Sequence, residues 1–292
     1  MAEANRVTVD PHVHRRRLQS AVRQARLDAG KTQPEVAAAL DWSLSKVVRI
    51  ESGAVRVSLT DLRALLDYYG IRDTARVEGL LEEARAARRP AWWSDYESLL
   101  GREFTSYLGF EGSATLVRQF QAGLVPGLLQ TESYARAVLT ALRAPEHVDQ
   151  LVEARRRRQR LLDRANPPRF VFVIDEAALR RRIGGPAVML DQLRRLDAVA
   201  RRPNVSVLAL PLDVGAHAGL GGSFVLLDVG DEQVAYLEDG EGGLLRRDAP
   251  AVTDDYLARF RKLENVAEPV ESILSRLIQE ISVAAQPAER LR

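Results

Sequence analysis

The chain has 292 residues, of which 46% are hydrophobic and 28% are charged, and it contains no cysteine. This length favours two domains, and the composition excludes wholesale disorder, a collagen-like chain, disulfides, thiolate catalysis and every cysteine-based metal site. The net charge is only +2, yet residues 6–63 hold roughly eleven basic and six acidic residues. This local excess of basic residues suits a contact with nucleic acid, although the arginine bias of a GC-rich genome would produce the same excess.

Apolar runs are short along the whole chain. The first ten residues are polar and lack the apolar core of a signal peptide. The most apolar run, residues 205–212, has about eight residues, whereas a membrane-spanning helix needs about 20. Together with the missing cysteines, these features predict a cytoplasmic protein that does not enter a membrane.

Residues 11–89 show helical periodicity in short segments separated by tight turns. Gly30 ends the first of these segments, because glycine adopts the left-handed cap conformation at least cost. Thr32 and Glu35 then form a capping box for the next helix, with Pro34 in its first turn. We therefore expect an all-helical domain of five helices over residues 1–89.

Pro90 marks a boundary, because proline biases the preceding residue away from helix. Beyond it we expect a second domain over residues 90–285 and a flexible tail over residues 286–292. Trp92 and Trp93 follow the boundary, where aromatic side chains either join two domains or cover a ligand cavity.

The second domain combines helical segments with short β-branched or aromatic runs that predict one mixed sheet. The expected strands are residues 170–174, 205–210, 224–228 and 234–237, and the expected helices are residues 131–142, 148–164, 176–182, 186–201 and 269–281. The fold class is thus an all-α domain followed by an α/β domain. The last helix carries an apolar stripe that packs either on its own domain or on a second subunit.

The segment KTQPEVAAALDWSLSKVVRIESG, residues 31–53, predicts two short helices joined by a turn at Asp41 and Trp42. Val36 and Val47 lie on the inner faces of these helices, and Ser43 is placed to cap the second one. The opposite face of the second helix is polar and fits a DNA major groove. The alternative is a small helical bundle without a nucleic-acid role.

At these residues the sequence resembles the lambda-Cro and xenobiotic-response-element family of helix-turn-helix regulators, over roughly residues 12–80. The resemblance implies that Leu44, Ser45 and Arg49 meet base edges, and that Gln33, Ser43, Lys46 and Arg56 meet DNA phosphates. It also implies a salt bridge between Arg26 and Glu51. Asp41 departs from the family, which commonly has glycine at this turn position.

Residues 125–139 (VPGLLQTESYARAVL) and 172–185 (FVIDEAALRRRIGG) resemble the effector domain of actinobacterial antitoxin-like regulators. Such regulators are typically encoded beside a very small protein, which implies that a small protein partner or ligand controls operator binding. One short recognition helix makes few base contacts, so we also expect a homodimer on paired half-sites of double-stranded DNA.

Acidic residues follow several expected strands, a place where α/β enzymes often gather catalytic or metal-binding carboxylates. They are Asp175, Glu176, Glu238 and Asp239, with His217 in a nearby glycine-rich loop. Such residues more often cap the next helix or face solvent. We therefore expect no enzyme, metal or cofactor, and keep a metal-dependent hydrolase and a pure protein-interaction module as alternatives.

Arg155 to Arg158, together with Arg160, form a basic run on an expected helix. Its simplest interpretation is a solvated helix face, and the alternatives are a second nucleic-acid patch or a docking face for an acidic partner.

Overall fold

The computed structural model describes residues 11–230, 232–238, 243–246 and 249–285. The chain divides into two compact units, of which the first ends at Ser94 and the second begins at Asp95. This division lies a few residues beyond the boundary expected at Pro90, and the expected tail over residues 286–292 falls outside the described residues. No helix in the described part of the chain is long and apolar enough to cross a membrane.

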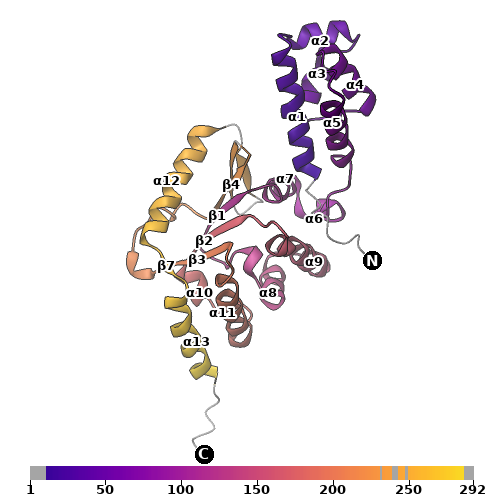
Figure 1. Ribbon diagram of the computed structural model, residues 1–292. Helices are drawn as coiled ribbons and strands as arrows, with labels where there is room; N and C mark the ends of the chain where they lie inside the picture. Colours follow the sequence, from indigo (N-terminus) through magenta and orange to yellow (C-terminus); the bar gives the residue numbers. More distant parts are fainter. Residues whose placement is uncertain (1–10, 231, 239–242, 247–248, 286–292) are drawn as a thin grey trace, which may run out of the picture. The chain divides into compact units, whose positions relative to one another are not determined.

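The first unit is a bundle of five helices, as the sequence predicts (Figure 1). They are α1 (Pro11–Asp28), α2 (Gln33–Ala39), α3 (Leu44–Glu51), α4 (Leu59–Tyr68) and α5 (Thr74–Ala86). Side-chain oxygens cap four of them, from Thr32, Ser43, Ser58 and Asp73. The bundle buries one apolar cluster, which includes Leu18, Val22, Val36, Val47, Leu62 and Leu81. Burial of this cluster, more than helix propensity, holds such short helices in place.

The second unit is built on a seven-stranded mixed sheet with the order β6-β5-β4-β1-β2-β3-β7. Its strands are β1 (Leu116–Gln121), β2 (Arg169–Asp175), β3 (Val205–Leu210), β4 (Phe224–Val229), β5 (Glu232–Leu237), β6 (Leu244–Arg246) and β7 (Glu268–Pro269). Strands β1, β2 and β3 are parallel, and β4, β5 and β6 continue from β1 as antiparallel neighbours. The predicted mixed sheet is confirmed, including the crossover from β2 to β3.

Helices lie on both sides of this sheet (Figure 1). They are α6 (Glu97–Leu100), α7 (Arg102–Glu111), α8 (Glu132–Leu142), α9 (Val148–Gln159), α10 (Glu176–Arg180), α11 (Pro186–Ala200), α12 (Pro250–Val266) and α13 (Glu271–Ala285). Phe260 and Leu263 of α12 join the apolar cluster that contains Phe120 and Phe224 from the sheet. On the other side, α8, α9 and α11 follow the parallel strands, as βα connections require.

Several elements differ from the sequence prediction. Strand β1 was not expected, because three of the six residues in its sequence LVRQFQ are polar, although two of these, Gln119 and Gln121, are buried in the structure. Helix α12 and the short strands β6 and β7 were not expected either. The expected helix over residues 148–164 ends at Gln159 and continues as a 3-10 turn.

Helix α13 resolves one of the alternatives that the sequence left open. Its apolar stripe is buried within the second unit and packs against α11. The stripe consists of Ile273, Leu274, Leu277 and Ile281, preceded by Val270. The helix is therefore a packing helix of its own domain, and this face is not available to a second subunit.

Candidate nucleic-acid interface

Helices α2 and α3 form the two arms of a helix-turn-helix. The Thr32 hydroxyl accepts a bond from Glu35 N, and Glu35 Oε2 accepts one from Thr32 N at 2.7 Å, which completes the capping box. The turn between the helices contains Asp41 with φ at 53°, the sole described non-glycine residue with positive φ. Asp41, which stands where the sequence comparison leads one to expect glycine, thus takes the left-handed conformation itself. Ser43 then caps α3 by accepting from Lys46 N at 3.2 Å.

The outer face of α3 is open to solvent. Val47 and Ile50 point into the bundle and are buried, whereas Leu44, Ser45 and Arg49 are exposed. Val48 is also exposed, at 40%, and Leu44 is exposed at 47%. The three residues expected to meet base edges therefore share one accessible face, and no described side chain of this unit covers it.

A buried ion pair fixes α3 to the rest of the bundle. Arg26 of α1 donates from Nε and Nη2 to the two carboxylate oxygens of Glu51, at 2.6 and 3.0 Å. The Glu51 side chain is 4% exposed, and the hydrogen bond that Arg26 donates to it raises the pKa of Arg26 above its usual value. Gln33 donates to the same carboxylate at 2.8 Å. The structure therefore brings Arg26, Gln33 and Glu51 together at the point where α1, α2 and α3 meet.

Gln33 is therefore held by the protein itself before any DNA is present. Its amide nitrogen has two hydrogens, of which one bonds Glu51. The second hydrogen is left for an acceptor at the N-terminus of α2, where an anion is also favoured by the helix dipole. This arrangement suits the phosphate role expected for Gln33.

Lys46 has partners within the first unit. Its ammonium donates to Asp61 of α4 at 2.8 Å and lies 3.6 Å from the centre of the Trp42 ring. The ion pair with Lys46 and the bonds from Ser58 lower the pKa of Asp61, although burial raises it. Because part of its charge is already neutralised, Lys46 has less to offer a phosphate than the exposed Arg56 has.

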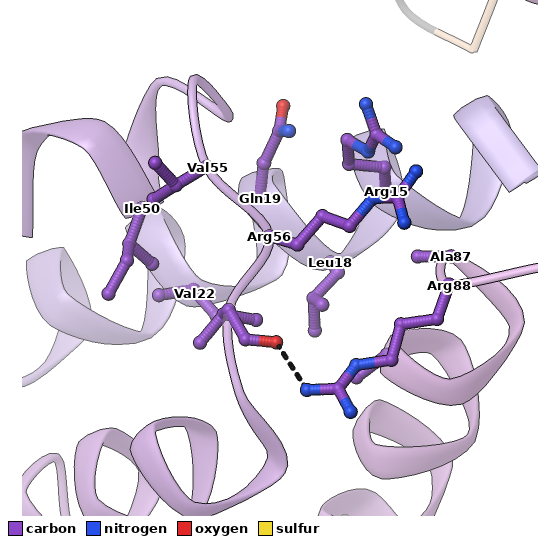
Figure 2. A pocket seen from close by; sticks show the side chains of 11 residues that line it. Arg15, Leu18, Gln19, Val22, Ile50, Val55, Arg56, Ala87 and Arg88 are labelled. Carbon is purple, nitrogen blue, oxygen red and sulfur yellow. Dashed lines mark hydrogen bonds between the residues drawn. The ribbon is translucent and has the colours of Figure 1, made fainter.

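Arg56 follows α3 and stands beside a small, largely apolar pocket that is separate from the outer face of α3. Figure 2 shows this pocket between α1, the segment after α3 and the end of α5, with Arg88 on its other side. Arg88 donates to the backbone oxygen of Val57 at 3.3 Å, which ties α5 to that segment. The pocket holds about one water-sized volume, so it is a packing defect of the bundle and not a ligand site.

Two exposed residues near the expected DNA contacts, one on α1 and one on α3, were not predicted from the sequence. Arg23 and Val48 line an open hollow together with Gln33, Pro34 and Ser52, above the Arg26–Glu51 pair. Arg23 is one helical turn before Arg26, and Val48 is one turn after Leu44. That spacing was the available signal, since residues one turn apart share a face.

The acidic residues of the second unit do not form a metal site among the described residues. Asp175 caps α10 by accepting from Ala177 N at 2.8 Å, and His217 Nε2 lies 3.4 Å from its carboxylate. The other ring nitrogen of His217 accepts from Gly219 N. Both imidazole nitrogens of His217 therefore have partners within the second unit.

The remaining carboxylates have separate partners. Glu176 accepts from Leu212 N at 3.1 Å and pairs with Arg180 and Arg276, and these bonds lower its pKa even though burial raises it. Glu238 accepts from Gln121 at 2.8 Å. Asp239 lies outside the described residues.

The basic run on α9 is not a uniformly solvated face, as the simplest interpretation had it. Arg156 and Arg157 are on the outside and pair with Glu153. Arg158 points inward, with a side chain only 10% exposed, and pairs with Glu111 at 2.7 Å. Arg155 is half-buried beside it. Helical spacing in the sequence cannot show which of these arginines points inward, because it does not reveal which of them meets a buried carboxylate.

Two family models match the chain. Residues 104–279 match a domain of unknown function (DUF5753), and residues 18–79 match a helix-turn-helix domain. Neither the curated proteins nor the solved structures contain a significant match to the chain. The second match coincides with the five-helix unit and supports a DNA-binding regulator.

Proposed function

The chain belongs to the family with the domain of unknown function DUF5753, here preceded by a helix-turn-helix domain, and we propose that it is a sequence-specific transcriptional regulator of the antitoxin-like kind. The observation that carries this proposal is the exposed face of α3, which the buried Arg26–Glu51 pair holds in a fixed orientation. Such a regulator acts on the chromosome, so we place it in the cytoplasm.

Within this interface the roles divide by chemistry. Arg49 presents a planar guanidinium that can donate two parallel bonds to one guanine, while Leu44 and Val48 offer apolar surface to thymine methyl groups. Ser45 provides a hydroxyl that suits several bases. Gln33, Ser43, Lys46 and Arg56, with the newly located Arg23, contact phosphates and set the position of α3 in the groove.

Replacing Arg49 with alanine tests the base-reading role. We expect the variant to lose about 1–3 kcal/mol of binding free energy on its operator and almost nothing on random DNA. Arg56→Ala should instead weaken binding to all sequences and reduce the salt slope by about one, with a smaller loss for Lys46→Ala because of its bond to Asp61.

Fluorescence anisotropy at several salt concentrations, with the promoter upstream of the chain's own gene and a scrambled duplex, measures both effects. Arg63→Ala, an exposed arginine on α4, serves as the charge-matched control. An equal loss on specific and random DNA for Arg49→Ala, or a loss confined to the operator for Arg56→Ala, would contradict the assigned roles.

We further propose that the protein binds as a homodimer to paired half-sites about one helical turn apart, because a single α3 reaches few base pairs. A docked small protein encoded by a neighbouring gene would change how the two α3 helices are spaced, and thereby the operator affinity. Since the stripe of α13 is occupied within its own domain, the dimer surface lies elsewhere.

Light scattering at micromolar concentration should give twice the chain mass, and saturating partner protein should shift the operator affinity severalfold in the anisotropy assay. A monomer on two half-sites would contradict the dimer. An unchanged affinity with demonstrably bound partner would contradict the control mechanism while leaving DNA binding intact.

A further inference from the structure

The interior of the second unit contains a polar cluster that DNA binding does not use. It lies between α7, α9, the Gly127–Leu129 turn and the ends of β1 and β5. Its charged members are Glu111, Arg155, Arg158 and Glu238. Each of these charges must be balanced, since an unpaired charge in a protein interior costs several kcal/mol.

Arg158 is balanced. It donates from Nε and Nη2 to the two oxygens of Glu111, each at 2.7 Å, and from Nη2 to the Tyr107 hydroxyl at 2.9 Å. Tyr107 in turn donates to Glu111 at 2.5 Å. The guanidinium of Arg158 also lies over the rings of Phe104 and Tyr107, at 5.4 and 5.2 Å from their centres. One arginine and one carboxylate of the cluster therefore satisfy each other.

Arg155, one helical turn earlier, is not balanced in this way. Its hydrogen bond in the described part of the chain runs from Nη1 to the amide oxygen of Gln130 at 2.5 Å, and no described carboxylate lies within ion-pair distance. Burial and the nearby charge of Arg158 lower the pKa of Arg155 to about 10. The residue as a whole is partly exposed.

The nearest acidic group does not supply the missing partner. Glu238 interacts with both arginines only at longer range, and its carboxylate accepts from Gln121 instead. Burial raises the pKa of Glu238. Arg155 thus remains a guanidinium that faces the cluster without a close anion.

A second, independent observation comes from β1. The side chain of Gln119 is 1% exposed, and its amide oxygen has no hydrogen-bond partner among the described residues. Alternation along the strand places Gln119 on the same face as Gln121, which binds Glu238. A buried acceptor without a donor is costly, and a bound molecule with a hydroxyl or an N–H group would satisfy it.

The turn next to the two arginines is held in place by hydrogen bonds. A Cβ added to Gly127 would lie 3.2 Å from Arg158 Nη1 and 3.9 Å from Arg155 Nε, so the backbone runs directly along both guanidinium groups. Gln159 holds this turn by donating to the backbone oxygens of Gly127 and Gln130, at 3.0 and 2.7 Å. The turn and Arg155 are thereby fixed before any ligand enters.

We propose that this cluster is a binding site for a small molecule with a carboxylate or phosphate group, which Arg155 binds through its free donors while Gln119 accepts from a polar group on the same molecule. A guanidinium is suited to this role because it presents two parallel donors to an oxyanion. The site belongs to the domain that the proposed function assigns to control, but ligand binding itself does not depend on DNA binding.

The test titrates the full-length chain with inorganic phosphate and, separately, with succinate, at an ionic strength matched by chloride. Calorimetry and thermal melts followed by circular dichroism should show saturable binding and a melting temperature a few degrees higher for at least one anion. Binding of phosphate alone identifies a phosphoryl ligand, and binding of succinate alone identifies a carboxylate ligand.

Arg155→Gln should lower the affinity by about tenfold or more, because it removes a charged hydrogen-bond donor. It should also melt no lower than the wild type in anion-free buffer, since it removes an unbalanced charge. Arg160→Gln, an exposed arginine directly after α9, is the matched control and should leave binding unchanged. If Arg155→Gln does not fold, Arg155→Lys gives the same comparison with a severalfold loss.

The proposal is overturned if neither anion binds the wild type beyond the chloride control, or if the Arg155 and Arg160 variants behave alike. Phosphate that binds at the DNA-contacting face would persist in Arg155→Gln, so failure of this site and failure of the proposed function are distinguishable.

Discussion

Replacing Glu51 with alanine is expected to destabilise the first unit by about 3–5 kcal/mol, because it leaves the guanidinium of Arg26 in the bundle without its carboxylate. The Arg26 side chain is 10% exposed, so water replaces the lost partner poorly. Gln33 loses its acceptor at the same time. A loss of this size is a large share of the stability of a small domain, and operator binding should fall with it.

Urea unfolding followed by tryptophan fluorescence measures this effect selectively, because all three tryptophans, Trp42, Trp92 and Trp93, belong to the first unit. Glu78→Ala removes an exposed pair with Arg85 and should cost under about 1 kcal/mol. The double variant Arg26→Met with Glu51→Leu should recover most of the stability. A cost for Glu51→Ala as small as that for Glu78→Ala would mean that the pair does not hold α3.

The second large effect is expected from Glu111→Ala in the other unit. The change leaves Arg158 without its carboxylate and Tyr107 without its acceptor, so we expect a loss of about 3–5 kcal/mol. The side chains of Glu111 and Arg158 are 2% and 10% exposed, which limits compensation by solvent. The tyrosine signal in near-ultraviolet circular dichroism should shift to lower urea, with the tryptophan transition unchanged.

Glu153→Ala is the matched control for this prediction. Glu153 lies on the same α9 and pairs with Arg156 and Arg157, but on the exposed side of the helix. Its removal should cost under about 1 kcal/mol. Similar costs for Glu111→Ala and Glu153→Ala would contradict the assignment of a buried network.

The first unit could be predicted closely because its signals are local. Thr32, Glu35 and Ser43 fix helix starts within a few residues of the side chains that they cap. The outward face of α3 follows from the same periodicity that buries Val47 and Ile50. Sequence could not show that Lys46 already pairs with Asp61, because that contact depends on how α4 packs.

The second unit was predicted less completely, because its key residues break the usual patterns. The glutamines at positions 119 and 121 made β1 resemble an exposed segment, although it is a central strand of the sheet. The inward direction of Arg158 depends on Glu111, which lies 47 residues earlier in the sequence. A single sequence carries no signal for such a long-range partner.

The order of the strands has a consequence for how the protein is made. In β1, Leu116 pairs with Arg169 of β2 and also with Asp228 of β4, so the middle of the sheet cannot close until most of the chain has left the ribosome. The five-helix bundle consists of contacts that are closer in sequence, and such topologies fold faster. During synthesis, the helix-turn-helix unit should therefore be folded while the sheet of the second unit is still open and prone to aggregation.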